Sequence, residues 1–172
     1  MVPARFALIR AINGYEAAWA GVASLAVAIV NVVSSSITSG SIMIEFDPSE
    51  AHHFLQTNRD ALLIDVRSDA EFFFVGHAVG ALHVAWLDGP DWLLNPHFVG
   101  EVSRLCGHAV DRPVVLICRS GRRSLDAAAA LEVAGFSAVH HVRHGFEGDL
   151  DDHHQRGKVN GWRHDDLPWE QL

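Results

Sequence analysis

Short apolar runs alternate along the chain with segments that carry helix-start signals. Strands are predicted at residues 61–66, 82–85, 114–117 and 138–142. Helices are predicted at residues 48–58, from 68 to just before Gly76, and at 96–106 and 122–134. Apolar strands without polar alternation imply burial on both faces of a sheet. The pattern therefore predicts an α/β fold in which a parallel sheet is flanked by helices on both faces.

Three helix starts are marked by their capping residues. Residues 47–50 read Asp-Pro-Ser-Glu, with an aspartate N-cap, proline at the first helical position and glutamate at the third. Residues 68–71, Ser-Asp-Ala-Glu, repeat the capping-box pattern, and Asn95-Pro96 is expected to cap the next helix. Ligands of such sheets bind at the carboxyl ends of the strands, so those ends are where functional residues are expected.

Cys118 lies at such an end, directly after the apolar run 114–117. It is followed by a basic, glycine-containing loop and a predicted helix. The loop consists of Arg119, Ser120, Gly121, Arg122 and Arg123. A helix N-terminus offers unpaired N–H groups and a positive dipole end, which favour a thiolate and a docked anion. The arrangement predicts a nucleophilic cysteine; the alternative is a small buried cysteine that ends a strand.

Asp65 and Arg67 lie at the carboxyl end of the strand predicted at residues 61–66. They could be catalytic, but an ion pair that supports the loops of the site is favoured. Metal binding is not expected although the chain has 12 histidines. His140 and His141 would point to opposite faces of one strand, so they cannot share a metal ion.

Composition limits the fold and the partners of the chain. With 172 residues and 49% hydrophobic composition, one well-packed domain is expected. A formal net charge of -8 argues against nucleic-acid binding, and positive potential should be local to the arginine loop. Cys106 and Cys118 show no metal or disulfide spacing, which favours a reducing, cytoplasmic location. Cys106 is expected to end a helix, with a resolving thiol as the alternative.

The first 42 residues are interpreted as an extension to a domain spanning residues 43–172. Residues 17–33 carry no charge and follow Arg5 and Arg10, as in a membrane anchor or an export signal. Alternatively, the true start of the protein is Met43, and the preceding residues belong to a mis-assigned start. Membrane association is therefore undecided. Lys158 is the only lysine among 13 basic residues, which indicates a genome rich in G and C and a bacterial source.

Two stretches, which occur in the same order as in the family, resemble the rhodanese-type sulfurtransferases, especially single-domain ones that use thiosulfate. One is the Cys118 loop. The other reads Leu-Leu-Ile-Asp-Val-Arg-Ser-Asp-Ala-Glu-Phe at 62–72, followed by Gly-His-Ala-Val-Gly-Ala-Leu-His at 76–83. The chain departs from the family pattern where Ala78-Val79 replaces isoleucine-proline and where His144-Gly145-Phe146 replaces a late Gly-Gly turn. The resemblance implies a rhodanese-like fold for residues 43–172. The tail from Gly148 onward lies outside the matching stretches, and its apolar residues Trp162, Leu167, Pro168 and Trp169 indicate that it wraps the domain.

The resemblance also implies an activity. Sulfane sulfur would pass from a small anionic donor, thiosulfate or a persulfide, through a Cys118 persulfide to a small-molecule or protein thiol. The arginine side chains of the loop would attract the donor, and the loop backbone would hold the persulfide. No cofactor is required, since sulfur is the carried group.

Two alternatives remain. Cysteine-dependent phosphatases and arsenate reductases space cysteine and arginine as C-x-x-x-x-x-R, whereas Ser124 occupies that seventh position here and Arg123 comes one residue early. A non-enzymatic persulfide carrier or interaction module is the third class.

Overall fold

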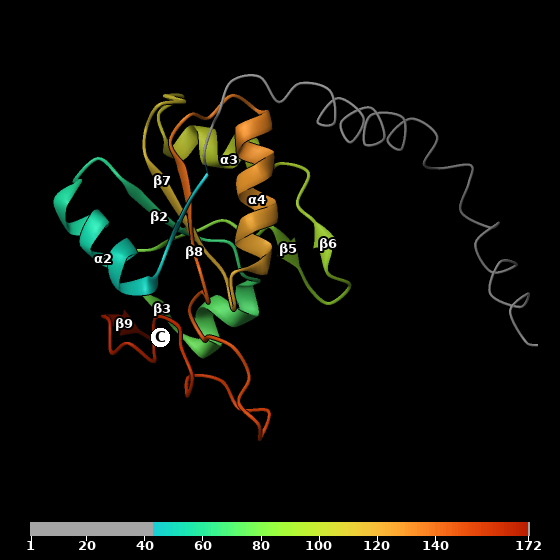
Figure 1. Ribbon diagram of the computed structural model, residues 1–172. Helices are drawn as coiled ribbons and strands as arrows, with labels where there is room; N and C mark the ends of the chain where they lie inside the picture. Colours follow the sequence, from blue (N-terminus) through green and yellow to red (C-terminus); the bar gives the residue numbers. More distant parts are fainter. Residues whose placement is uncertain (1–42, 172) are drawn as a thin grey trace, which may run out of the picture. The chain divides into compact units, whose positions relative to one another are not determined.

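Five parallel strands form the central sheet, in the order β1-β8-β7-β2-β4 (Figure 1). The computed structural model describes residues 43–171. The strands are β1 Ile44–Phe46, β2 Leu62–Asp65, β4 Leu82–His83, β7 Val114–Ile117 and β8 Val139–Val142. The predicted parallel sheet is confirmed, with β7 at its centre. Strand β1 was not predicted, because three residues at a sheet edge leave little hydrophobic pattern.

Helices cover both faces of this sheet, as predicted. Helix α2 (Pro48–Thr57) lies on one face, while α3 (Phe98–Leu105) and α4 (Arg122–Val133) cover the other (Figure 1). Successive strand residues alternate between the two faces: Leu116 packs towards α3 and α4, whereas Val115 and Ile117 pack towards α2. Since β7 is covered on both sides, all four of its residues are buried.

The capping predictions are confirmed for α2 and corrected for α3. The Asp47 N–H donates to Glu50 Oε2 at 2.9 Å at the start of α2. Helix α3 begins at Phe98 and not at Pro96, because Asn95 stabilises a turn instead of capping the helix. Its Oδ1 accepts the His97 N–H at 2.9 Å, and its Nδ2 donates to the Ala85 carbonyl at 3.0 Å.

The short helix predicted after Ser68 is present, and its segment η1 (Glu71–Val75) is π-helical, which the sequence pattern did not predict. The capping box is formed: the Ser68 N–H donates to Glu71 Oε2 at 3.1 Å, and the Glu71 N–H approaches Ser68 Oγ at 3.3 Å. Strands β5 (Leu87–Asp88) and β6 (Leu93–Leu94) form a separate hairpin beyond β4.

The C-terminal segment wraps the domain, as expected. Trp162 is buried in the core beside Phe146, and its Nε1 donates to the Pro168 carbonyl at 2.9 Å. Strand β9 (Trp169–Glu170) then pairs antiparallel with β3 (His77–Ala78). The Gly-His-Ala-Val turn that departs from the family pattern is therefore held by the tail.

His140 and His141 lie on opposite faces of β8, as predicted. The His140 ring packs against Phe46 and Phe54, whereas His141 Nε2 lies 3.2 Å from Glu45 Oε2. Burial lowers the pKa of both imidazoles. Within residues 43–171, no group of three or more histidine, cysteine or acidic side chains is placed to hold a metal ion.

Residues 1–42 lie outside the described residues, so the predictions of an anchor, a signal or a mis-assigned start stay predictions. Among residues 43–171, no helix combines the length and apolar character needed to cross a membrane.

Candidate active site

Cys118 directly follows the central strand β7 and is 1% exposed. Its neighbours across the sheet are the carboxyl ends of β2 and β8, where Asp65 pairs in register with Ile117. The sequence prediction that Cys118 and the Asp65–Arg67 pair lie at the same edge of the sheet is therefore confirmed. Cys118 is therefore almost fully covered by the surrounding residues.

The carbonyl groups at the start of the loop are bound by the segment that follows β8. The Cys118 carbonyl accepts the Phe146 N–H at 2.7 Å, and the Arg119 carbonyl accepts the Glu147 N–H at 2.9 Å. By contrast, no acceptor within residues 43–171 pairs with the N–H groups of Arg119, Ser120 and Gly121. The loop therefore has N–H donors available for an anion, as in a backbone nest.

Two glycines allow this loop to close. Gly121 is the N-cap of α4 and has φ 90°, in the left-handed region that favours glycine. Gly145 has φ 60°, and a Cβ atom added there would lie 2.2 Å from the Cys118 carbonyl oxygen. The turn after β8 thus packs directly beneath the loop. His144, where the family pattern has glycine, also adopts a positive φ of 62°.

Asp65 and Arg67 form the expected ion pair, with Arg67 Nη2 2.7 Å from Asp65 Oδ2 and both side chains fully buried. The same Nη2 donates to the Gly76 carbonyl at 2.6 Å, and Nη1 lies 3.5 Å from Glu147 Oε1. Arg67 thereby joins β2 to the turn at Gly76 and to the segment that binds the loop carbonyls. Burial beneath the loop favours support over catalysis for both residues, and that role stays a prediction.

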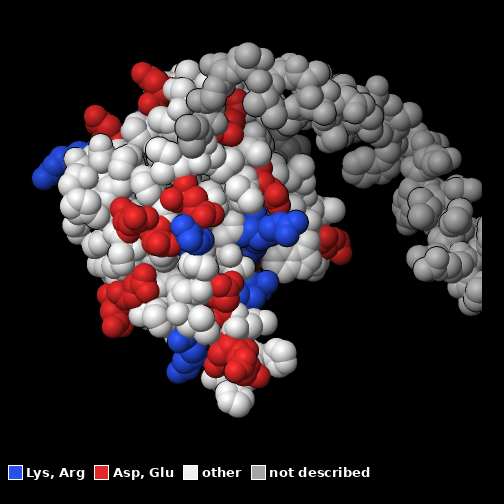
Figure 2. Space-filling view, viewed as in Figure 1, with Lys and Arg blue, Asp and Glu red and all other residues white. Residues whose placement is uncertain are grey.

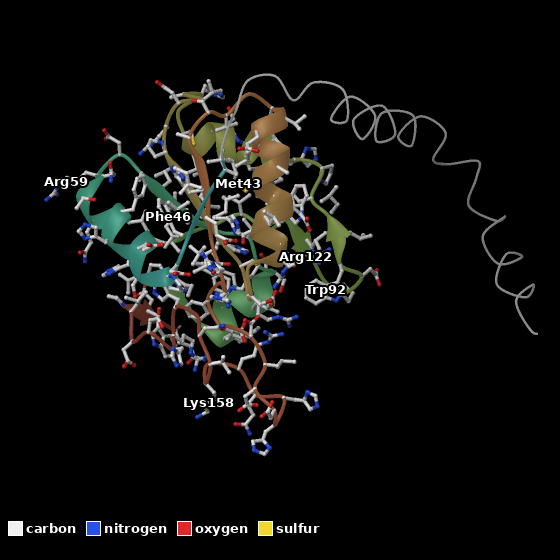
Figure 3. All side chains as sticks on the ribbon, viewed as in Figure 1. Met43, Phe46, Arg59, Trp92, Arg122 and Lys158 are labelled. Atoms are coloured by element: carbon white, nitrogen blue, oxygen red, sulfur yellow. The ribbon has the colours of Figure 1, made fainter. Side chains whose placement is uncertain are left out.

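The loop arginines differ in their surroundings. Arg122 is exposed at the beginning of α4, where Figure 3 labels it. The Arg119 side chain is 44% exposed, and its Nε lies 4.0 Å from Glu71 Oε1. Arg123 is only 12% exposed, and its guanidinium carbon lies 5.4 Å from the centre of the Trp92 ring.

Glu71 neutralises Arg123, a pairing that the sequence analysis missed. Arg123 Nη1 and Nη2 each lie 2.7 Å from a Glu71 carboxylate oxygen, in a bidentate pair. Burial raises the pKa of Glu71, but the hydrogen bond and charge of Arg123, with smaller help from Ser68, outweigh it and lower the pKa to about 2. Glu71 lies 52 positions from Arg123, so only its capping-box position and its place in the family-like stretch 62–72 marked it in the sequence.

The basic side chains at the site are partly balanced by acidic ones. On the face shown in Figure 2, basic side chains are interspersed with acidic ones and form no continuous stripe. Arg119 and Arg122 are the loop side chains whose charges reach solvent most directly.

Ser124 is a second residue that the sequence analysis left out of the site. It is fully buried in the first turn of α4, and its Oγ lies 3.4 Å from Cys118 Sγ and 2.9 Å from the Gly121 carbonyl oxygen. Only its position after the basic loop could have indicated it.

Comparisons with known proteins agree with this geometry. The Rickettsia prowazekii (strain Madrid E) protein RP600 is 30% identical over 124 residues, which cover 71% of this chain and 93% of its own length. GlpE of Pseudomonas putida strain GB-1, named as a thiosulfate sulfurtransferase, is 36% identical over 100 residues, covering 58% of this chain and 79% of GlpE. The crystal structure of Rv0390 from M. tuberculosis has a TM-score of 0.66 and 36% identity, covering 74% and 97% of the two chains.

The sequence pattern of the rhodanese-like domain matches residues 47–151, a span that contains Cys118, its loop and the Asp65–Arg67 pair. Since this match covers more than half of the 172 residues, the chain belongs to the rhodanese-like domain family.

Proposed function

We propose that this protein is a sulfurtransferase that carries sulfane sulfur on Cys118. The observation that carries the proposal is the pair of features around that sulfur: a cysteine at the end of the central strand, and a loop whose first N–H groups have no acceptor among the described residues. A relative named as a thiosulfate sulfurtransferase, 36% identical over 100 residues, supports the same chemistry.

The reaction would proceed in two displacements. The Cys118 thiolate attacks the outer sulfur of thiosulfate, the S–S bond of the donor breaks, and its electron pair leaves with sulfite. The product is a Cys118 persulfide, whose terminal negative charge the N–H groups of Arg119, Ser120 and Gly121 would bind. A thiol, a protein thiol or cyanide then attacks the outer sulfur and releases the thiolate. With a persulfide donor, the thiolate attacks the outer sulfur in the same way, and the donor leaves as a thiolate in place of sulfite.

Glu71 favours this reaction over phosphoryl or arsenate chemistry. A phosphatase loop uses its arginine to bind the oxygen atoms of the transferred group, which requires a guanidinium with free donors. Here Arg123 Nη1 and Nη2 each bind a Glu71 carboxylate oxygen at 2.7 Å, so this two-nitrogen edge of the guanidinium is not free to bind a transferred oxyanion. The loop backbone remains available, and it suits a single sulfur atom.

Intact-mass measurement after thiosulfate treatment tests the proposal directly. We expect the mass to rise by about one sulfur atom on Cys118, and a reducing thiol should remove it, because a persulfide is reversible. The Cys106→Ser variant should gain the same mass. Thiosulfate treatment that leaves the mass unchanged, together with hydrolysis of an aryl phosphate, would contradict the proposal.

We further expect Arg122→Ala to raise the KM for thiosulfate by about three- to tenfold, with a smaller effect on an uncharged sulfur donor, since an exposed charge attracts an anion at long range. High salt should mimic the substitution, because exposed charges are screened over about 10 Å at ~0.1 M salt. Steady-state kinetics with both donors measure the difference.

Arg59→Ala is the matched control, since Arg59 is also exposed but lies on the far side of the domain from Arg122 (Figure 3). Arg123→Ala would be a poorer test, because it would also leave the partly buried Glu71 carboxylate without its partner. Equal losses with charged and uncharged donors would argue against attraction by Arg122.

A further inference from the structure

Ser124 offers a hydroxyl group that lies between two acceptors. Its Oγ is 3.4 Å from the Cys118 sulfur and 2.9 Å from the Gly121 carbonyl oxygen. The residue is fully buried, so water does not compete for either contact. Ser124 also belongs to the regular first turn of α4, which fixes its side chain relative to the sulfur atom.

The hydroxyl carries one proton, so it can donate to only one of these acceptors at a time. While Cys118 is a thiol, its S–H can donate to Ser124 Oγ and the hydroxyl donates to Gly121. Once Cys118 becomes a thiolate, the sulfur can only accept. The Gly121 carbonyl retains the Leu125 N–H at 3.2 Å, so the hydroxyl can turn to the sulfur without leaving that carbonyl unpaired.

We propose that Ser124 is a catalytic residue whose hydroxyl stabilises the Cys118 thiolate, by turning from the Gly121 carbonyl to the sulfur when negative charge forms there. This inference rests on the proposed sulfur transfer through Cys118. In the second displacement, the acceptor attacks the outer sulfur and the S–S electron pair moves onto Cys118 Sγ. Ser124 donates to that atom as the charge develops, which lowers the barrier to release.

Ser124→Ala tests this role because it removes the hydroxyl and no charge. The charged groups around the loop remain in place, namely Asp65, Arg67, Glu71, Arg119, Arg122, Arg123 and Glu147. We expect the pH midpoint of thiolate formation to rise by about one unit, since a hydrogen bond to a charged group favours the ionised form. Ultraviolet thiolate absorbance of the full chain in a Cys106→Ser background, with the Cys118→Ser signal subtracted, measures this midpoint.

Kinetics provide a second readout. In Ser124→Ala, kcat for sulfur transfer to cyanide should fall about tenfold while the KM for thiosulfate stays nearly constant, because Ser124 contacts the cysteine sulfur and not the donor. Ser124→Thr retains a hydroxyl and should keep the native midpoint. Ser137→Ala, at an exposed serine after α4, is the matched control and should change neither quantity.

A midpoint in Ser124→Ala that moves no further than in Ser137→Ala would overturn the inference, even if activity fell. The absorbance titration needs no sulfur donor, so it separates this inference from the proposed function. Failure of the native chain to gain sulfur from thiosulfate, with a shifted midpoint in Ser124→Ala, would reject sulfur transfer and retain the thiolate contact.

Discussion

Cys118→Ser is expected to abolish sulfur transfer, with kcat reduced by at least about 1000-fold, because a serine hydroxyl is a far poorer nucleophile than a thiolate near neutral pH. The variant should remain folded, since oxygen replaces sulfur in a site that already contacts the Ser124 hydroxyl. Thiocyanate formation from thiosulfate and cyanide measures the loss, and a circular dichroism spectrum checks the fold.

Cys106→Ser is the matched control for this substitution. Cys106 ends α3, is 3% exposed and packs in the core on the α3–α4 face. Burial raises the pKa of its thiol, so it is a weak nucleophile as well as an inaccessible one. We expect most of the activity to remain. Loss of transfer in Cys106→Ser with retention in Cys118→Ser would reverse the assignment of the nucleophile.

Local sequence pattern was sufficient to locate Cys118, the proposed nucleophile, at the end of a strand and before a helix. A continuous apolar run, a cysteine, a basic loop with glycine and a helix follow one another within a few residues, and each signal acts over a short stretch of chain. The structure confirms β7 and the start of α4 at the predicted residues. The loop resemblance added the family, which the match over residues 47–151 bears out.

The residues that the sequence analysis missed are those whose roles depend on distant partners. Glu71 looked like a capping residue and does cap Ser68, but its second role needs Arg123, which is brought near only by the fold. For the same reason, the free charge of the loop was overestimated. Three arginines occur in the loop, but Arg123 is neutralised by the partly buried Glu71 carboxylate. The pairing of Glu71 with Arg123, 52 positions apart, produces no periodic pattern that a single sequence could reveal.

The error at α3 has a different cause. Asn95-Pro96 is a good helix start by local rules, yet the Asn95 amide also donates to Glu101 at 3.0 Å and to the Ala85 carbonyl. These tertiary contacts use the side chain to fix the end of the β5–β6 hairpin, and the helix begins two residues later than the proline. Capping residues and turn residues share the same chemistry, so sequence alone did not separate them.

Arg67→Met is expected to lower the free energy of unfolding by about 3–5 kcal/mol, because removing one partner of a buried ion pair leaves an uncompensated charge. Asp65 would lose three side-chain hydrogen bonds from the guanidinium, and the Gly76 carbonyl would lose its donor. Such a loss is a large part of the roughly 5–15 kcal/mol that stabilises an ordinary domain. Urea unfolding followed by tryptophan fluorescence measures it.

The double variant Asp65→Leu/Arg67→Met should recover part of this loss, since replacing both members of a buried pair with apolar side chains removes the unpaired charge. It should nevertheless transfer sulfur poorly. The Glu147 carboxylate would lose Arg67, and Glu147 donates the backbone N–H that holds the Arg119 carbonyl at the start of the loop.

Arg59→Met, at an exposed position, is the control and should change stability by less than about 0.5 kcal/mol. An Arg67→Met protein as stable as Arg59→Met would mean that Asp65 is compensated by other groups, and a double variant with native activity would show that the pair does not position the loop.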